Sequence, residues 1–232
     1  MKHSGKARRA AIKLILLSLI AVIIIWALGV FTGTIVAVIT AVALAITPFV
    51  AVLWLVFAAF TIYFFRDPTA RVPPGENLIL SPGHGKIDVI DTATEPFFMG
   101  GECQRVSMFL SVFDVHVQNA PFSSRIAFLR YTTGQFLNAL RTESATHNEN
   151  VLLGFEDTNP PGRKLAVRLI AGVIARRIVP FIKLGDEVKA GDRISLIQFG
   201  SRADVYLPLN AKIKIKLGDH VVGGQTILAT FE

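Results

Sequence analysis

The sequence holds very few cysteines: Cys103 is the single one among 232 residues. One thiol excludes an intrachain disulfide and any metal site built from several cysteines, and it fits a reducing compartment. The simplest interpretation of Cys103 is a small, buried hydrophobic side chain. The histidines and carboxylates are not spaced as metal ligands either, so we expect no bound metal.

Charged side chains are absent from residues 14–65, an apolar tract of 52 residues. One helical membrane crossing needs roughly 20 apolar residues, so we expect a transmembrane anchor here. Gly29 and Gly33 indicate a break, which gives a first span near 14–31 and a second drawn from 34–65. Two spans are the preferred interpretation. Three remain an alternative, because Pro48 would kink or divide the second.

Positive charge is concentrated before the anchor. The net charge of the chain is +7. Residues 1–13 contribute five Lys or Arg and no acid, whereas the region after residue 65 has 19 basic and 17 acidic side chains. The bias of basic residues toward the cytoplasm predicts a cytoplasmic tail over 1–13 and a soluble domain on the cytoplasmic side of the cell membrane. We therefore expect a phospholipid bilayer as partner and no nucleic acid.

Residues 66–232 are numerous enough for one domain, and their pattern is mainly β with short helices, an α+β class. Short helices are weakly indicated at 136–141 and 170–177. Apolar runs separated by Pro, Gly and Asn clusters predict strands at 78–80, 87–90, 105–110, 125–131, 151–156 and 165–170.

The C-terminal part contains an internal repeat: Lys183–Gly191 recurs 33 residues later as Lys216–Gly224. Each copy predicts a corner, in which Gly-Asp turns the chain, Val points inward and the last Gly permits a positive φ. The pattern resembles the turns of biotinyl- and lipoyl-carrier barrels, so we expect a barrel-sandwich-like C-terminal part. No lysine occupies a carrier hairpin tip, which disfavours a carrier role.

A Gly-Ser pair, Gly200 and Ser201, lies where a strand pattern over 194–197 meets a tight turn before a second β-rich run at 205–207. A hydroxyl presented there can attack its own backbone. By itself, however, Gly-Ser in a turn is most often only a turn.

Seven blocks, in order, resemble the phosphatidylserine decarboxylase proenzymes, in particular the short bacterial kind with two membrane spans. The likeness covers nearly the whole chain. The blocks are Arg66–Pro68, Ser81–Lys86, Phe109–Pro121, Gly134–Asn138, Asn148–Asn150, Ala175–Ile178 and Phe199–Pro208.

The resemblance implies a catalytic domain over 66–232 that cleaves itself between Gly200 and Ser201, giving chains 1–200 and 201–232. Ser201 would then become a covalent pyruvoyl group, which serves in place of any other cofactor. This group would form a Schiff base with phosphatidylserine and release CO2, leaving phosphatidylethanolamine.

Two histidines are candidates for the chemistry. His116 matches the family's catalytic histidine for decarboxylation, and an imidazole that titrates near neutrality suits proton transfer. His84 stands where the family usually has the Asp of Ser-Pro-Ala-Asp-Gly, which takes part in self-cleavage. We expect His84 to act as the base toward Ser201, with Asp88 as a distant source of a carboxylate.

Two alternatives stay open at this point. The departure at His84 is compatible with a relative that folds but does not cleave, a membrane-anchored barrel that acts as a binding or assembly module. Within the enzyme class, the substrate could be another serine phospholipid.

Overall fold

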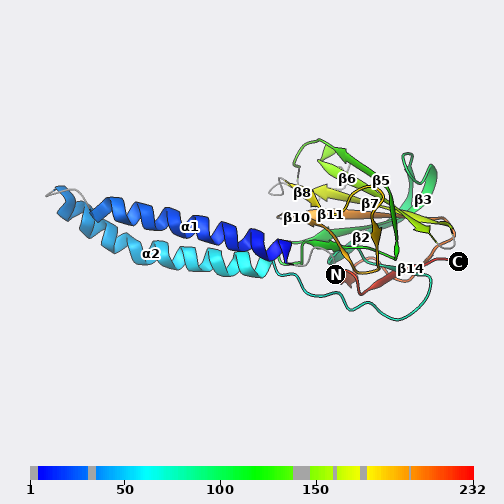
Figure 1. Cartoon of the computed structure of the whole chain (residues 1–232), viewed down its shortest axis with the longest axis horizontal. Coiled ribbons are helices and arrows are strands. Elements are labelled where there is room, and N and C mark those ends of the chain that lie inside the picture. Colours follow the sequence, from blue (N-terminus) through cyan, green and yellow to red (C-terminus); the bar gives the residue numbers. More distant parts are fainter. Residues whose placement is uncertain (1–4, 31–34, 138–146, 159–160, 173–176, 199) are drawn as a thin grey trace. The chain divides into compact units, whose positions relative to one another are not determined.

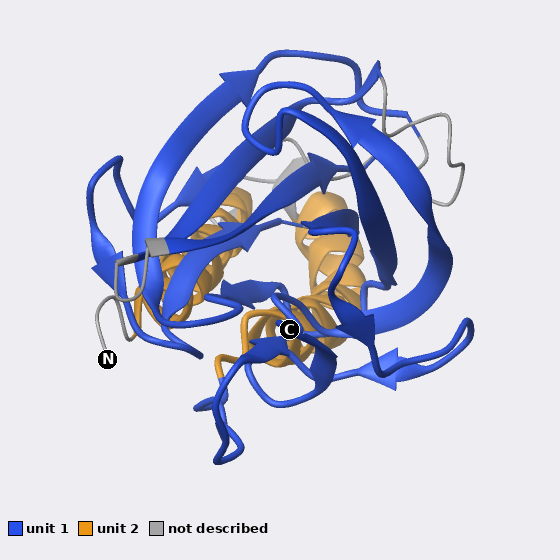
Figure 2. Cartoon of the chain, turned by 90° about the vertical axis from the view of Figure 1, so that its right-hand side faces the viewer, with its two compact units in different colours: residues 1–4, 68–232 blue, residues 5–67 orange. Residues whose placement is uncertain are grey.

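The computed structural model describes residues 5–30, 35–137, 147–158, 161–172, 177–198 and 200–232. The chain divides into two compact units, a helical unit over Gly5–Asp67 and a β unit that begins at Pro68 and runs to Glu232. Figure 2 shows the two units in different colours.

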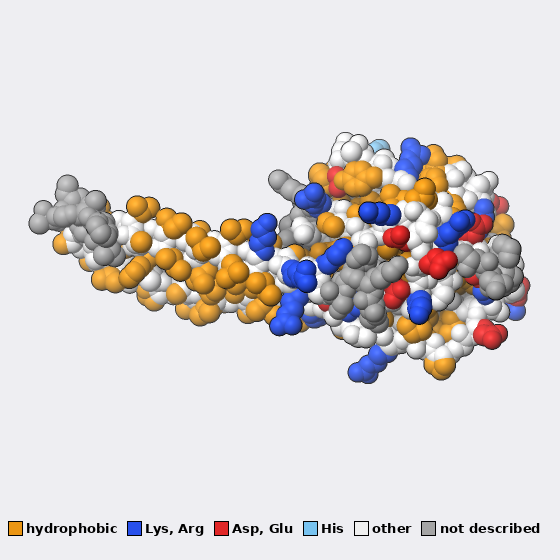
Figure 3. All heavy atoms as spheres, in the orientation of Figure 1, with side chains coloured by type: hydrophobic (Ala, Val, Ile, Leu, Met, Phe, Trp, Pro, Cys, Tyr) orange, Lys and Arg blue, Asp and Glu red, His pale blue; other side chains and the backbone are white. Residues whose placement is uncertain are grey.

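The helical unit consists of two antiparallel helices, α1 (Lys6–Val30) and α2 (Ile35–Phe64), in its described residues. Both are long and apolar enough to cross a membrane, and Figure 3 shows hydrophobic side chains along them. They contact each other through Trp54, whose Nε1 donates a hydrogen bond to Ser18 Oγ at 2.6 Å. Pro48 lies inside α2 without dividing it, so α2 is a single helix over Ile35–Phe64.

The β unit is built on an eight-stranded antiparallel sheet in the order β13-β2-β3-β11-β7-β6-β5-β9. This sheet curls into a half-barrel (Figure 2). Its strands are β2 (Gly85–Glu95), β3 (Gly101–Leu110), β5 (Ser124–Thr132), β6 (Asn150–Thr158), β7 (Pro161–Ala171), β9 (Glu187–Val188), β11 (Ser201–Leu207) and β13 (His220–Val221).

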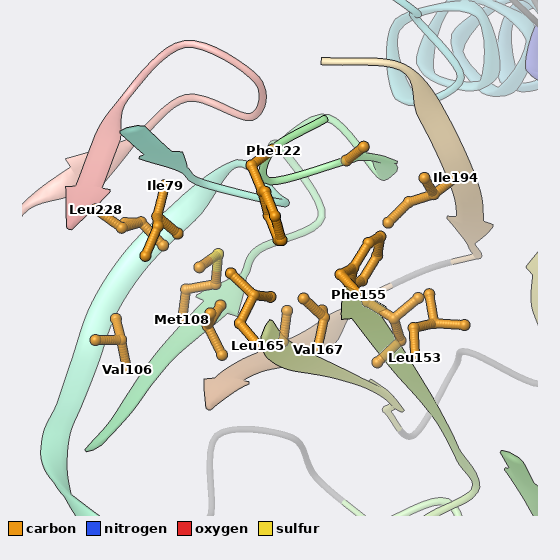
Figure 4. Close-up of a cluster of buried hydrophobic side chains, with 14 of the residues drawn as sticks. Ile79, Val106, Met108, Phe122, Leu153, Phe155, Leu165, Val167, Ile194 and Leu228 are labelled. Atoms are coloured by element: carbon orange, nitrogen blue, oxygen red, sulfur yellow. The ribbon is translucent and has the colours of Figure 1, made fainter. Parts of the chain in front are cut away.

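Two three-stranded sheets complete the described part of the β unit, in the orders β1-β14-β12 and β4-β10-β8. Their strands are β1 (Leu78–Leu80), β4 (Val117–Asn119), β8 (Ile178–Pro180), β10 (Arg193–Ile197), β12 (Lys212–Ile213) and β14 (Ile227–Thr230). Apolar side chains from all three sheets meet in one core, part of which Figure 4 shows around Phe122, Phe155 and Leu165.

Strand β11 lies in the middle of the large sheet, between β3 and β7. Side chains alternate along a strand, so Ala203, Val205 and Leu207 enter the core from one face. We call this the inner face, and Ser201 belongs to it by the same alternation. Arg202, Asp204 and Tyr206 lie on the opposite, outer face.

The structure confirms the mainly β fold class, and each of the six predicted strands lies within an observed one. The helix predicted over 170–177 is wrong at its start, because Ile170 and Ala171 end β7 and pair with β11. Strand partners on either side outweigh a short stretch of helix-forming residues. Phe136 and Leu137 are not helical, and 138–141 and 173–176 lie outside the described residues.

The repeat forms two equivalent corners at the two ends of the large sheet. In each copy the Asp side chain accepts a backbone N–H three residues upstream, Lys183 to Asp186 at 2.9 Å and Lys216 to Asp219 at 2.8 Å. The last glycines, Gly191 and Gly224, have φ of 80° and 65° as predicted. The two inward valines are buried at positions 188 and 221.

Candidate active site

The Gly200–Ser201 peptide combines a left-handed backbone with a buried hydroxyl. Gly200 has φ of 69°, a conformation that glycine adopts at little cost. Ser201 opens β11 and is 0 % exposed, and its Oγ has no hydrogen-bond partner among the described residues. Buried hydroxyls are nearly always hydrogen-bonded, so this one is available for another role.

His116 lies against this peptide. The Gly200 N–H donates to His116 Nε2 at 3.1 Å, and His116 Nδ1 lies 2.9 Å from the Asp114 carbonyl oxygen. A carbonyl can only accept, so Nδ1 carries the proton and Nε2 presents a lone pair, the neutral form of imidazole. The structure thus brings together three of the residues singled out in the sequence.

The loop that carries His116 is braced by a carboxylate. Asp114 Oδ2 accepts from the backbone N–H and the hydroxyl of Ser111, both at 2.8 Å. Its Oδ1 lies 2.9 Å from Nε2 of His220, in the second repeat corner. The sequence analysis did not identify this pair. The repeat contained a signal for it, because the first copy has Glu187 where the second copy has His220.

His84 lies elsewhere in the β unit. A Cβ on Gly223 would come within 3.1 Å of His84 Nε2 and 2.8 Å of Asn119 Oδ1, so both side chains pack against that glycine. His84 helps line a pocket of about 470 Å³ with residues 68–71, 222, 223 and 225. It directly precedes β2, and β3 separates β2 from β11, a spacing of about 10 Å. Its assignment as the base toward Ser201 stays a prediction.

Asp88 is paired with Arg202 rather than with His84. Arg202 Nη1 and Nη2 donate to the two carboxylate oxygens at 2.8 and 2.7 Å, a bidentate arrangement. The register of β2 against β3 shifts between Ile87 and Val89, so Asp88 falls at an irregularity of the strand. Sequence reasoning missed Arg202, although its place directly after Ser201 was a signal.

Asp204 adds a second acid beside Arg202, with 3.4 Å between Arg202 Nε and Asp204 Oδ1. Burial raises the pKa of Asp204, and the positive charges of Arg202, Arg105 and Arg168 offset this only in part. The outer face next to Ser201 therefore carries ionisable side chains, of which Arg202 and Asp204 are buried and Asp88 is exposed, in contrast to the apolar inner face.

Comparison with known proteins gives one consistent result. The phosphatidylserine decarboxylase family model matches residues 57–229. The phosphatidylserine decarboxylase proenzyme of Desulfotalea psychrophila is 42 % identical over 176 residues, 76 % of this chain and 81 % of that protein. The proenzyme of Rickettsia bellii is 44 % identical over 178 residues, 75 % of each chain. That of Ruegeria pomeroyi is 42 % identical over 173 residues, 73 % of this chain and 78 % of that protein.

The matched region spans nearly the whole β unit, including the Gly200–Ser201 peptide and both histidines. A family model over this length and relatives above 40 % identity agree with the resemblance seen in the motifs. The chain belongs to the phosphatidylserine decarboxylase family.

Proposed function

We propose that this chain is a phosphatidylserine decarboxylase that matures by cleaving itself between Gly200 and Ser201. The observation that carries the proposal is the buried Ser201 Oγ, which has no partner in the described part of the chain, beside a left-handed glycine whose N–H binds His116. The names of the relatives, which include the word proenzyme, support it.

The cleavage needs only groups of the chain and one water. Ser201 Oγ attacks the Gly200 carbonyl carbon, so an ester replaces the amide. Loss of the Ser201 Cα proton then breaks the Cβ–Oγ bond, which releases residues 1–200 with a carboxylate and leaves dehydroalanine at 201. Its enamine tautomerises to an imine, and water displaces ammonia to give a pyruvoyl group.

The residues around position 201 fit these steps. Gly200 holds the bend that exposes its carbonyl, and a Cβ there would meet nothing closer than Val112 Cγ1 at 4.0 Å. His116 Nε2 fixes the Gly200 N–H before cleavage. Once the peptide is cut, the 200 end is no longer tethered to 201, and Nε2 becomes available to move a proton on the substrate.

The pyruvoyl group supplies a carbonyl that condenses with the substrate amine and accepts the electrons released with CO2. Residue 201 carries this pyruvoyl group, and the apolar side chains on the inner face of β11 keep water away from the group. The neutral His116 imidazole is hydrogen-bonded to the adjoining residue, Gly200.

The membrane arrangement follows the same proposal. We place the tail 1–13 in the cytoplasm, an anchor over 14–65 in the cell membrane, and the catalytic domain 66–232 on the cytoplasmic face. A lipid substrate favours an enzyme tethered where head groups are concentrated.

Intact mass and turnover test the proposal together. Purified enzyme should give two polypeptides, one of them 32 residues long with a blocked amino terminus, and should release CO2 from phosphatidylserine in mixed micelles. A single 25.3 kDa chain without activity would favour the non-cleaving barrel. If the enzyme cleaves itself but releases CO2 only from a different serine phospholipid, the proposed substrate is wrong.

A further inference from the structure

We propose that the Asp88–Arg202 ion pair clamps the two fragments together after cleavage and fixes the position of residue 201. The inference rests on the proposed cleavage between Gly200 and Ser201. Asp88 and Arg202 are then positioning residues, since neither has to touch the substrate.

Cleavage turns a residue in the middle of the chain into a chain terminus. Ser201 pairs with Leu110 on one side and Ala171 on the other, and these pairs are the last of the two ladders that hold β11. Chain ends fray unless they are tied down. The reactive group would sit on the residue most exposed to fraying, so something must hold it.

Arg202 is placed to do this. It is the second residue of the new fragment, it is 1 % exposed, and it forms two hydrogen bonds of 2.7 and 2.8 Å with Asp88. Asp88 belongs to β2 and therefore to the large fragment, and β3 lies between β2 and β11. The pair thus reaches across a whole strand and joins the two fragments one residue away from the reactive position.

The geometry requires arginine in particular. A planar guanidinium binds both oxygens of one carboxylate, which fixes direction as well as distance, whereas a lysine ammonium is a point charge on a flexible stem. Arg202 is the buried member of the pair, since 1 % of its side chain is exposed against 32 % for Asp88. Removing Asp88 takes the bidentate partner from a buried guanidinium, so we expect a larger effect than from the loss of a pair in which both side chains are partly exposed.

The chain offers a matched control in the same strand. Asp91 of β2 also forms a bidentate pair, with Arg105 of β3. The two carboxylates are similarly exposed, 42 % for Asp91 and 32 % for Asp88, but Arg105 is 28 % exposed where Arg202 is 1 %. Both partners of the Asp91 pair lie in the large fragment. Asp91→Asn therefore removes an ion pair of the same kind without touching the link between the fragments.

The decisive experiment compares Asp88→Asn and Asp91→Asn in the full-length enzyme, purified through a tag on the large fragment. We expect Asp88→Asn to cleave, to lose the 32-residue fragment at a lower denaturant concentration than wild type, and to show kcat lowered roughly tenfold to a hundredfold with KM within about twofold. Asp91→Asn should match wild type in all three measurements. Wild-type retention and kcat in Asp88→Asn would overturn the clamp.

A second comparison separates the clamp from a simple contribution to folding. In the uncleaved Ser201→Ala chain, Asp88→Asn should still give a folded protein with cooperative thermal unfolding. Failure of this double variant to fold would overturn the clamp in favour of a folding role. Arg202→Lys should cleave and retain the fragment less well than wild type. If wild type itself stays uncleaved, the proposed function fails, and not the clamp alone.

Discussion

The two faces of β11 differ sharply around the predicted cleavage site. On the inner face, Ser201 presents a buried hydroxyl without a described partner, followed by the core residues Ala203 and Val205. On the outer face, Arg202 is fully buried yet bonded twice to Asp88, with Asp204 beside it. The inner face thus leaves one hydroxyl without a described partner in apolar surroundings. The outer face binds Arg202 to Asp88 through two hydrogen bonds, although both carboxylate oxygens of Asp204 have no hydrogen-bond partner among the described residues.

The side chains on the outer face differ between the two ends of β11. At the far end of β11, Tyr206 packs in a small apolar cluster with Cys103 and Leu152 under the β2–β3 turn. Glu95 holds that turn, since its carboxylate accepts three backbone N–H bonds, from residues 97, 98 and 99. The Arg202–Asp88 pair and Asp204 thus lie toward the Ser201 end, next to the position where the chemistry is proposed, while the guanidinium of Arg168 lies over the Tyr206 ring at 5.3 Å.

Removing the inner-face hydroxyl should have the largest effect. Ser201→Ala leaves no nucleophile, so we expect one uncleaved chain and no turnover. A denaturing gel and intact mass measure cleavage, and CO2 release measures turnover. Cleavage at 200–201 in this variant would contradict the role given to the inner face.

We expect the next largest effects on turnover and cleavage from substituting the two histidines, and we expect the two variants to differ. His116→Ala removes the imidazole bonded to Gly200, so we expect turnover to fall by about 10² to 10⁴-fold and cleavage to slow by about tenfold through loss of one hydrogen bond.

His84→Ala is the comparison for that variant. The prediction that His84 is the base toward Ser201 means that His84→Ala should slow cleavage more than His116→Ala does, although β3 lies between His84 and Ser201. Pulse-chase conversion of the precursor measures both rates. A complete block in His84→Ala alone would support His84 as the base, and cleavage at the wild-type rate would contradict it.

The bend before Ser201 gives a moderate prediction. Gly200→Ala adds a Cβ that meets nothing closer than Val112 Cγ1 at 4.0 Å, so its effect comes from the left-handed φ, which costs an L-residue roughly 1–2 kcal/mol. We expect cleavage to slow by about tenfold, measured by the same pulse-chase. The same substitution in the Ser201→Ala chain should lower the free energy of unfolding by about 1 kcal/mol, and unchanged values in both would show that the bend is not needed.

The smallest effect concerns the apolar end of the outer face. Burial raises the pKa of the Cys103 thiol, and the side chain is 1 % exposed. We expect no alkylation of the native enzyme at neutral pH and complete alkylation after unfolding, with unchanged turnover in reagent-treated native enzyme. Rapid labelling of the native state would show that this end of the face opens.

The sequence alone determined the two long apolar helices, several of the strands, the two corners and the Gly-Ser pair, because each depends on local pattern: hydropathy over 52 residues, alternation along a strand, and glycine at positive φ. It also singled out His116 through a family motif. These features need no knowledge of which strands are neighbours.

Only the tertiary structure decided which of these residues meet. Sheet order places β3 between His84 and Ser201, pairs Asp88 with Arg202 across that strand, and brings His220 to Asp114 from 106 positions away. Pattern along a chain fixes which face a side chain takes, but the neighbour across a sheet depends on pairing between distant strands. That pairing gave Arg202 its partner, and no local signal in the sequence could have done so.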